Sequence, residues 1–276
     1  MDARAFSFEF FPPRTAEGKE KLRTTWQTLA KLKPRFFSCT YGAGGSTREG
    51  TLETVLDIRA AGHEAAPHIS CVASTRDDVA TQLERYKSNG IRHIVALRGD
   101  LPSGLGASGE FRYANELVSF IRSRTGDWFH IEVACYPEYH PQTRWTKDEL
   151  VAFKRKVEAG ANAAITQYFY NVDAYFRFVD EARKAGIQVP IVPGIMPIGN
   201  FSQLARFSEA CGAEIPRWMR IKLEGYHDDT TSIRAFGLDV VTDLCKRLLE
   251  GGAPGLHFYT LNQATLSAEI WKRLGL

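Results

Sequence analysis

The sequence Phe6-Ser7-Phe8-Glu9-Phe10-Phe11-Pro12-Pro13 lies near the N-terminus and predicts a buried β-strand that ends at the two prolines. Side chains of a strand alternate between its faces, so Ser7, Glu9 and Phe11 share one side. A carboxylate there loses much of its water, which raises its pKa unless a cation pairs with it. Glu9 is therefore either a proton donor that works near neutral pH or a buried carboxylate paired with arginine or lysine. The strand alone leaves both interpretations open.

Similar apolar runs recur along the chain and alternate with amphipathic helical patterns. Strands are predicted over residues 5–11, 35–41, 65–72, 92–99, 129–136, 163–169, 189–196 and 255–261. Helices are predicted near 16–32, 47–61, 76–89, 112–125, 146–159, 172–185, 200–210, 229–250 and 264–274. We expect helix N-caps at Thr146 and Asn171, and glycines that follow helix ends at Gly62, Gly90, Gly160 and Gly186.

Eight strands, each followed by a helix, in a chain of 276 residues are typical of a (β/α)8 TIM barrel. The alternative is a doubly wound open sheet, which usually has fewer strands, and no G-x-G-x-x-G sequence follows the first strand. No composition shift or linker divides the chain, so we expect a single α/β domain over residues 1–276. The segment Pro102–Gly109 has the length and composition of a loop that is either functional or disordered.

The composition excludes several classes of protein. No apolar run reaches the roughly 18–20 residues that a membrane span needs, and Glu9 and the proline pair interrupt the early apolar stretch that a signal peptide would require. The net charge of +3 and the short basic run 154–156 argue against a nucleic-acid partner. Five widely spaced cysteines in apolar surroundings predict reduced core residues in a cytoplasmic protein.

Barrel enzymes carry their chemistry at the C-terminal ends of the strands. Those ends are rich in polar and aromatic residues, namely Glu9, Thr40, Tyr41, His68, Ser70, Arg98, Asp100, Tyr136, Glu138, His140, Gln167, Tyr259 and Asn262. Each alone has an ordinary structural interpretation, but their coincidence at one face indicates a site. His68, Asp100, Glu138 and His140 show no metal-ligand spacing, so no metal is expected there. There is no G-x-S-x-G motif and no suitable strand-end lysine, which leaves a cofactor to carry the reaction with Glu9 as the acid.

Nine segments in order along nearly the whole chain resemble methylenetetrahydrofolate reductases of the bacterial type. They are Phe8–Arg14, Thr40–Ala43, Ala66–His68, Ala96–Asp100, Tyr136–Pro141, Gly160–Asn162, Ile165–Gln167, Pro193–Pro197 and His257–Asn262. The resemblance implies a (β/α)8-barrel flavoprotein that binds FAD without a Rossmann fingerprint. It implies hydride transfer from NADH or NADPH through FAD to 5,10-methylenetetrahydrofolate, giving 5-methyltetrahydrofolate in ping-pong turnover. It covers the catalytic barrel alone, without the regulatory domain of eukaryotic relatives.

The same resemblance assigns roles to individual residues. Glu9 matches the general acid that protonates the folate nitrogen, and Asp100 matches the acid beside the pterin. Thr40, Gln167, Gln203, Phe207 and position 263 match substrate contacts. The FAD positions fall on Tyr41, Ala43, His68, Arg98, Gly99, Asp100, Tyr113, Ala114, Tyr136, His140, Arg155 and Lys156. Of these, Arg98, Arg155 and Lys156 suit a diphosphate because they are cationic.

Two departures from the family pattern concern ligand affinity. Gln263 stands where the family commonly has an arginine that grips the glutamate tail of folate, so tail binding weakens unless Arg14 or Lys222 substitutes. Glu149 and Ala152 replace the usual acid and amide near the adenosine of FAD.

Two other functions remain open from the residues alone: a flavin-free folate-dependent transferase or lyase, and a folate-binding barrel without turnover. The choice between NADH and NADPH, the direction of the reaction and a possible homo-oligomer are also open.

Overall fold

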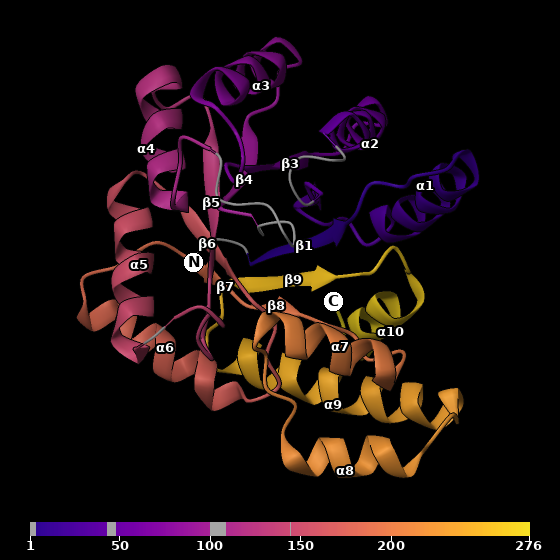
Figure 1. Cartoon of the computed structure of the whole chain (residues 1–276). Coiled ribbons are helices and arrows are strands. Elements are labelled where there is room, and N and C mark those ends of the chain that lie inside the picture. The colour runs from indigo at the N-terminus through magenta and orange to yellow at the C-terminus, as the bar shows by residue number, and fades with distance from the viewer. Residues whose placement is uncertain (1–3, 43–47, 100–108, 144) are drawn as a thin grey trace.

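The computed structural model describes residues 4–42, 48–99, 109–143 and 145–276, and Figure 1 shows strands at the centre with helices around them. The strands are β1 (Ala5–Phe10), β2 (Phe36–Cys39), β3 (Ala65–Ser70), β4 (His93–Leu97), β5 (His130–Cys135), β6 (Ala163–Thr166), β7 (Ile191–Val192), β8 (Gly194–Ile195) and β9 (Gly255–Tyr259). The helices are α1 (Ala16–Ala30), α2 (Arg48–Ala60), α3 (Arg76–Ser88), α4 (Ala114–Thr125), α5 (Thr146–Glu158), α6 (Val172–Lys184), α7 (Phe201–Cys211), α8 (Arg217–Gly225), α9 (Thr230–Glu250) and α10 (Thr265–Arg273).

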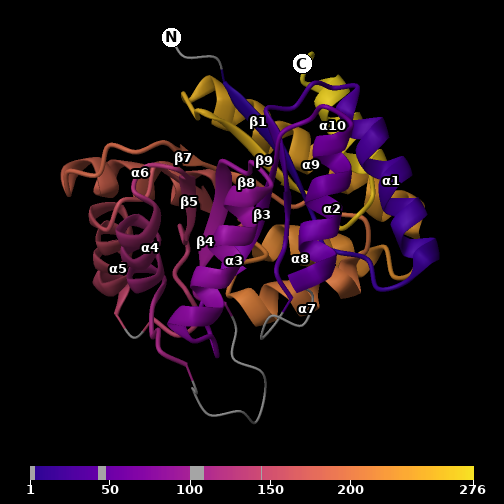
Figure 2. The same cartoon turned by 90° about the horizontal axis from the view of Figure 1, so that it is seen from above.

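All strand pairs are parallel, and their order is β7-β6-β5-β4-β3-β2-β1-β9-β8. Strands β7 and β8 lie on either side of Pro193, so the predicted single strand 189–196 is wrong in this detail. Proline has no N–H to donate, and here the chain changes its partner from β6 to β9. Because β7 continues into β8, the sheet closes into the predicted (β/α)8 barrel. Figure 2 shows the same strands and helices in a view turned by 90° from that of Figure 1.

The two faces of β1 follow the predicted alternation. Phe8 and Phe10 are fully buried on the outer face, where the ring of Phe8 packs against Phe37, Phe258 and Trp271. The inner face of the barrel has its own apolar cluster of Phe36, Ala66, Val95 and Ile165. Ser7 and Glu9 point into this interior, so the strand sequence places a carboxylate inside the barrel.

The helix ends mostly agree with the sequence. Asn171 accepts a hydrogen bond as the N-cap of α6, and the four glycines predicted after helices all have positive φ. Helix α5 begins at Thr146 and its N-cap is Trp145, so the N-cap prediction at Thr146 is wrong by one residue.

Helix α8 was not predicted from the sequence. Only Met219 and Leu223 of α8 are buried, whereas Trp218 and Ile221 are exposed. The Trp218 ring packs on Phe236 of α9. No helix in the described ranges is long and apolar enough to cross a membrane.

Candidate active site

Glu9 lies near the C-terminal end of β1, inside the barrel, with its side chain 15% exposed. His68 on β3 and His257 on β9 approach it, and Nε2 of each ring lies 3.2 Å from Oε2 of Glu9. The His257 contact is a hydrogen bond, and His68 lowers the pKa of Glu9 chiefly through its charge. On the other side of the His257 ring, Nδ1 lies 2.7 Å from Oγ of Ser7, which fixes the orientation of the imidazole.

The two histidines lower the pKa of Glu9 and so change its expected protonation state. Burial raises the pKa of this carboxyl group, but the charge of His68 and the hydrogen bond from His257 outweigh it and lower the pKa to about 2. The sequence predicted a carboxyl group that stays protonated near neutral pH in apolar surroundings, and this is wrong for the free protein. Among the described residues, the ionic partners of Glu9 are the imidazoles of His68 and His257, not an arginine or lysine.

His257 and Ser7 were not predicted to belong to this site. The alternation of side chains along β1 and β9 could have indicated both residues. Ser7 is the register partner of His257, and Glu9 is the register partner of Tyr259. Recognising it required knowing that the first and last strands pair.

Arg98 and Gly99 follow β4 at the same mouth of the barrel. The backbone oxygen of Arg98 accepts a hydrogen bond from Oγ of Ser70 at 2.9 Å. Gly99 has a φ of +86°, and a Cβ at this position would collide with that same Oγ. Only glycine therefore brings the backbone so close to β3. The Sγ of Cys71 reaches the backbone oxygens of Arg98 and Tyr113, which brings these two predicted FAD positions together.

Lys156 on α5 is a buried cation beside the predicted FAD positions of β5. Its Nζ donates to the backbone oxygen of Ala134 at 2.6 Å and lies 5.8 Å from the centre of the Tyr136 ring. Burial lowers the pKa of Lys156, with Glu149 opposing and Arg98 adding to the effect. The positive charges of Arg98 and Lys156 therefore lie close enough to repel each other.

The neighbouring loop is held by the residue that departs from the family pattern. Glu149 accepts hydrogen bonds from the backbone N–H of His140 and from Oγ1 of Thr143. The ring centres of His140 and Tyr136 are 4.8 Å apart. Arg155, which precedes Lys156 on α5, is exposed, and Ala152 is exposed as well.

The predicted substrate positions on α7 and after β9 meet in one small pocket of about 80 Å³. It is lined by Pro197, Gly199, Asn200, Gln203, Arg234, Tyr259, Thr260, Leu261, Gln263 and Leu266. Gln203 and Gln263 are thus brought together, and the pocket adds a cation, Arg234 of α9, that the sequence did not single out. Phe207 lies one turn along α7 from Gln203, with the Arg206 guanidinium 5.7 Å from its ring centre.

Strand ends β2, β6 and β9 supply further predicted residues. Tyr41 is partly buried, and the Arg48 guanidinium lies 5.8 Å from its ring centre. Thr40 accepts a hydrogen bond from Oγ1 of Thr51 through its backbone oxygen. Gln167 accepts one from the backbone N–H of Tyr168 through Oε1.

The remaining predicted positions lie outside the described residues or at the start of α4. Ala43 and Asp100 lie outside the described residues, as does segment 102–108 of the predicted loop. The side chain of Tyr113 is 57% exposed, and Ala114 begins α4 next to it.

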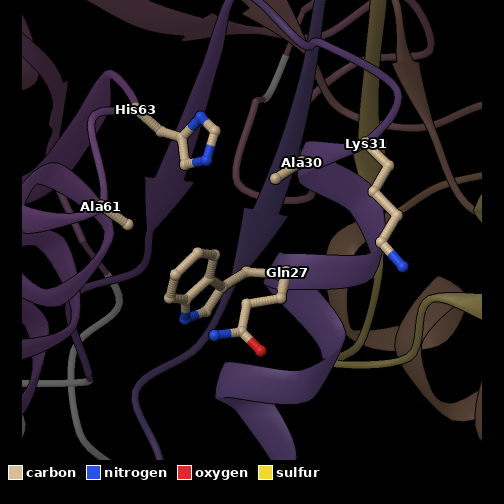
Figure 3. A pocket seen from close by; sticks show the side chains of 6 residues that line it. Gln27, Ala30, Lys31, Ala61 and His63 are labelled. Carbon is tan, nitrogen blue, oxygen red and sulfur yellow. The ribbon is translucent and has the colours of Figure 1, made fainter.

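A separate hollow of about 350 Å³ lies between α1 and the loop after α2. Figure 3 shows that Gln27, Ala30, Lys31, Ala61 and His63 line it. None of the predicted site residues lies there.

Glu138 is a further carboxyl group near the mouth of the barrel. Its Oε2 accepts the backbone N–H of Glu214 at 2.8 Å, and burial raises its pKa to about 7.

A parallel (β/α)8 barrel with a carboxylate–histidine cluster at the carboxyl ends of its strands defines a barrel enzyme. Residues 1–275 match the methylenetetrahydrofolate reductase family, and the chain belongs to that family. The 5,10-methylenetetrahydrofolate reductases of Salmonella typhimurium and Escherichia coli are each 44% identical over 271 residues, which are 98% of this chain and 90% of theirs. The Arabidopsis thaliana protein named methylenetetrahydrofolate reductase (NADH) 1 is 39% identical over 99% of this chain and 48% of its own length.

Solved structures show the same fold at lower identity. A Clostridium thermocellum protein described as binding two copies of 5-methyl-5,6,7,8-tetrahydrofolic acid matches 99% of this chain and 93% of its own, with a TM-score of 0.68 and 18% identity. A dihydropteroate synthase from Thermus thermophilus matches 99% of this chain and 95% of its own, with a TM-score of 0.52 and 12% identity. These likenesses concern the fold alone. The family assignment comes from the sequence relatives, and it makes the protein a methylenetetrahydrofolate-reducing oxidoreductase.

Proposed function

We propose that the chain is a flavoprotein that uses FAD and NADH to convert 5,10-methylenetetrahydrofolate to 5-methyltetrahydrofolate. The observation that carries this proposal is the Glu9 carboxylate with two imidazoles at 3.2 Å, inside the C-terminal mouth of the barrel. When bound, FAD supplies reversible two-electron hydride chemistry. The name of the Arabidopsis relative supports NADH as the donor. A cytoplasmic location agrees with the five cysteines, all of which are free.

The residues around Arg98 fit a bound dinucleotide. Lys156 is a buried ammonium group whose described partner is a carbonyl oxygen, with the Arg98 cation close by. Two cations in partly dehydrated surroundings favour an anionic ligand such as a diphosphate. Gly99 keeps the backbone free of a side chain where it approaches β3. We assign Tyr41, His68, Arg98, Gly99, Tyr113, Ala114, Tyr136, His140, Arg155 and Lys156 to this ligand, together with Ala43 and Asp100 outside the described residues.

We assign the proton delivery to Glu9 together with His257. With a pKa of about 2, Glu9 alone does not hold a proton near pH 7 in the free protein. A carboxylate and an imidazole in contact share protons as a unit, and histidine ordinarily exchanges protons near neutral pH. In this arrangement Ser7 orients the His257 ring against Glu9, and Glu9 passes the proton to the folate nitrogen. Covering the mouth with ligand removes more water from Glu9, which favours its protonated form.

We propose that folate lies on the side of Gln203, with its glutamate tail toward the pocket that contains Gln263 and Arg234. Arg234 is exposed and lines this pocket. It provides a cation where Gln263 replaces the expected arginine. Gln167, Thr40 and Phe207 contact the pterin or the nicotinamide, which use the same mouth in turn, and this accounts for ping-pong turnover. Asp100 stays a proposed contact of the pterin.

The substitution Glu9→Gln tests this assignment because it removes the ionisable group and keeps its size. We expect the variant to retain bound flavin and its reduction by NADH. Reduction of methylenetetrahydrofolate should fall by at least about 100-fold, which is a typical contribution of a general acid. The measurement is stopped-flow flavin absorbance in each half-reaction separately. Glu53→Gln, on the exposed face of α2, serves as the control.

Equal loss in both half-reactions would assign Glu9 to flavin binding or folding instead of proton transfer. A colourless protein that does not take up FAD would contradict the flavin proposal as a whole. The flavin-free transferase or lyase and the barrel without turnover gain no support from the relatives named above, which are reductases by name.

A further inference from the structure

A second cluster of titratable side chains lies at the opposite mouth of the barrel, where β4 and β5 begin. His93 and His130 are the first residues of these strands and are register partners, and Glu132 follows two positions along β5 on the same face. Oε1 of Glu132 lies 3.0 Å from Nε2 of His93 and 3.9 Å from Nε2 of His130. One ligand atom from each residue lies within 4.8 Å of the others. None of these residues has a role in the proposed reaction.

Glu132 is the deeply buried member of this cluster. The residue is 5% exposed, and Oε1 is bonded to His93. Its other oxygen, Oε2, is buried and has no hydrogen-bond partner among the residues that the structure describes. A buried carboxylate oxygen ordinarily contacts a donor or a cation. The contact with His93 therefore satisfies only one of the two carboxylate oxygens of Glu132.

Arg122, which acts on the neighbouring His130, makes its hydrogen bonds to other groups. The Arg122 guanidinium donates to the backbone oxygens of Gly126, Phe129 and Gly160 and to the Asn162 side chain. His130 adds a second imidazole beside the carboxylate, with its Nε2 3.9 Å from Oε1 of Glu132. Neutral imidazole nitrogens are common ligands of transition-metal ions.

We propose that His93, His130 and Glu132 bind one divalent transition-metal ion, with Zn²⁺ as the preferred occupant. Zinc takes nitrogen and carboxylate ligands at about 2.0–2.2 Å, which sets neighbouring ligand atoms roughly 3.3 Å apart in a tetrahedral site. The two carboxylate–imidazole separations of 3.0 and 3.9 Å bracket this value, and all three ligand atoms lie within 4.8 Å of one another. Two imidazoles with one carboxylate favour zinc-like ions over Mg²⁺ and Ca²⁺.

His130 gives the ion a route from solvent, because its side chain is 44% exposed. The ion would link His93 and His130, the first residues of β4 and β5, and thereby stabilise the N-terminal end of the barrel. The expectation of no metal site concerned the C-terminal mouth, whereas this cluster lies at the other end. The inference is therefore independent of the flavin proposal.

The test is calorimetric titration of Zn²⁺ into the metal-stripped full chain, prepared without a histidine tag. We expect one equivalent to bind, and at 100-fold excess over Kd the ion should raise Tm by on the order of 5 °C. His130→Ala and Glu132→Gln should each weaken binding at least 10-fold. His227→Asn, which removes an exposed imidazole elsewhere, should leave it unchanged. Co²⁺ should give the absorption bands of a low-symmetry site in the wild type and lose them in His130→Ala.

His130→Ala is the decisive variant because its position is the most exposed of the three. Circular dichroism of the metal-free form checks that it folds. Absence of stoichiometric binding in the wild type would overturn the proposal, and so would binding that survives in both cluster variants or falls equally in His227→Asn. Full flavin-dependent activity in the stripped wild type is compatible with the site, so failure here does not count against the proposed function.

Discussion

Glu9 shows how far a single residue can be interpreted from its own strand. The alternation of side chains over Phe6–Phe11 correctly predicted that Glu9 lies on the face of the strand opposite Phe8 and Phe10. In the barrel this face points inward. Its ionisation did not follow, because the pKa is set by His68 and His257, which come from strands far away in the sequence. Local sequence thus predicted the location of the acid, while tertiary neighbours decide its charge.

A titration of Glu9 tests the influence of these neighbours. In wild type the depressed pKa stabilises the folded state above the ordinary value of 4.5, and this contribution is lost as the pH falls toward about 2. Replacing His257 by Asn removes a contact that lowers the pKa and leaves the burial that raises it. We therefore expect the midpoint to move upward in His257→Asn, observed by NMR of the labelled Glu9 carboxyl carbon. An unchanged midpoint would mean that His257 does not control this group.

At the scale of elements, the apolar runs and the glycines after helix ends predicted the strands and helices that the structure describes, with two exceptions. The single strand 189–196 is divided into β7 and β8, and α8 was not predicted. Those signals are local, because a strand needs only its own alternating apolar side chains and a helix its own caps. The break at Pro193 was missed because it reflects a change of partner, from β6 to β9, that no single strand encodes. Helix α8 was missed because it is short, with nine residues, and buries only Met219 and Leu223.

The β1–β9 pairing makes a prediction about Gly255. A Cβ at this position would collide with the backbone oxygen of its register partner Ala5. We expect Gly255→Ala to lower the free energy of unfolding by at least about 3 kcal/mol, measured by urea denaturation. Gly252→Ala is the matched control, since a Cβ there meets nothing within 4 Å and only the positive φ of 92° costs about 1 kcal/mol. Equal losses in the two variants would show that the collision relaxes.

At the scale of the whole molecule, closure of the barrel assembles the substrate side from distant segments. Gln203, Arg234 and Gln263 come from α7, from α9 and from the segment after β9, yet they line one pocket. The sequence provided Gln203 and Gln263 through the family resemblance, and it suggested Arg14 or Lys222 as the compensating cation. Arg234 emerged only from the assembled fold, since nothing in its local sequence marks it.

The folate tail provides the corresponding test. Arg234→Ala should raise KM for polyglutamylated methylenetetrahydrofolate by about 10-fold. This corresponds to the lower end of the free energies of charge-assisted contacts, which we expect because the Arg234 side chain is exposed. Gln263→Arg should lower KM in wild type and restore it in Arg234→Ala. Steady-state kinetics with Arg220→Ala as an exposed control measure this effect. If Arg234→Ala leaves KM unchanged, another cation holds the tail.

His257 has a consequence for how the protein is made. Its contacts with Ser7 and Glu9 span 250 and 248 residues, so the acid group forms only when β9 meets β1. A ribosome adding roughly 5–20 residues per second needs on the order of 10–50 s to travel that far. During this time the β9 edge of β1 has no partner strand, and the contacts of His257 with Ser7 and Glu9 are absent. The proposed proton donor is therefore assembled only after β9 has been synthesised.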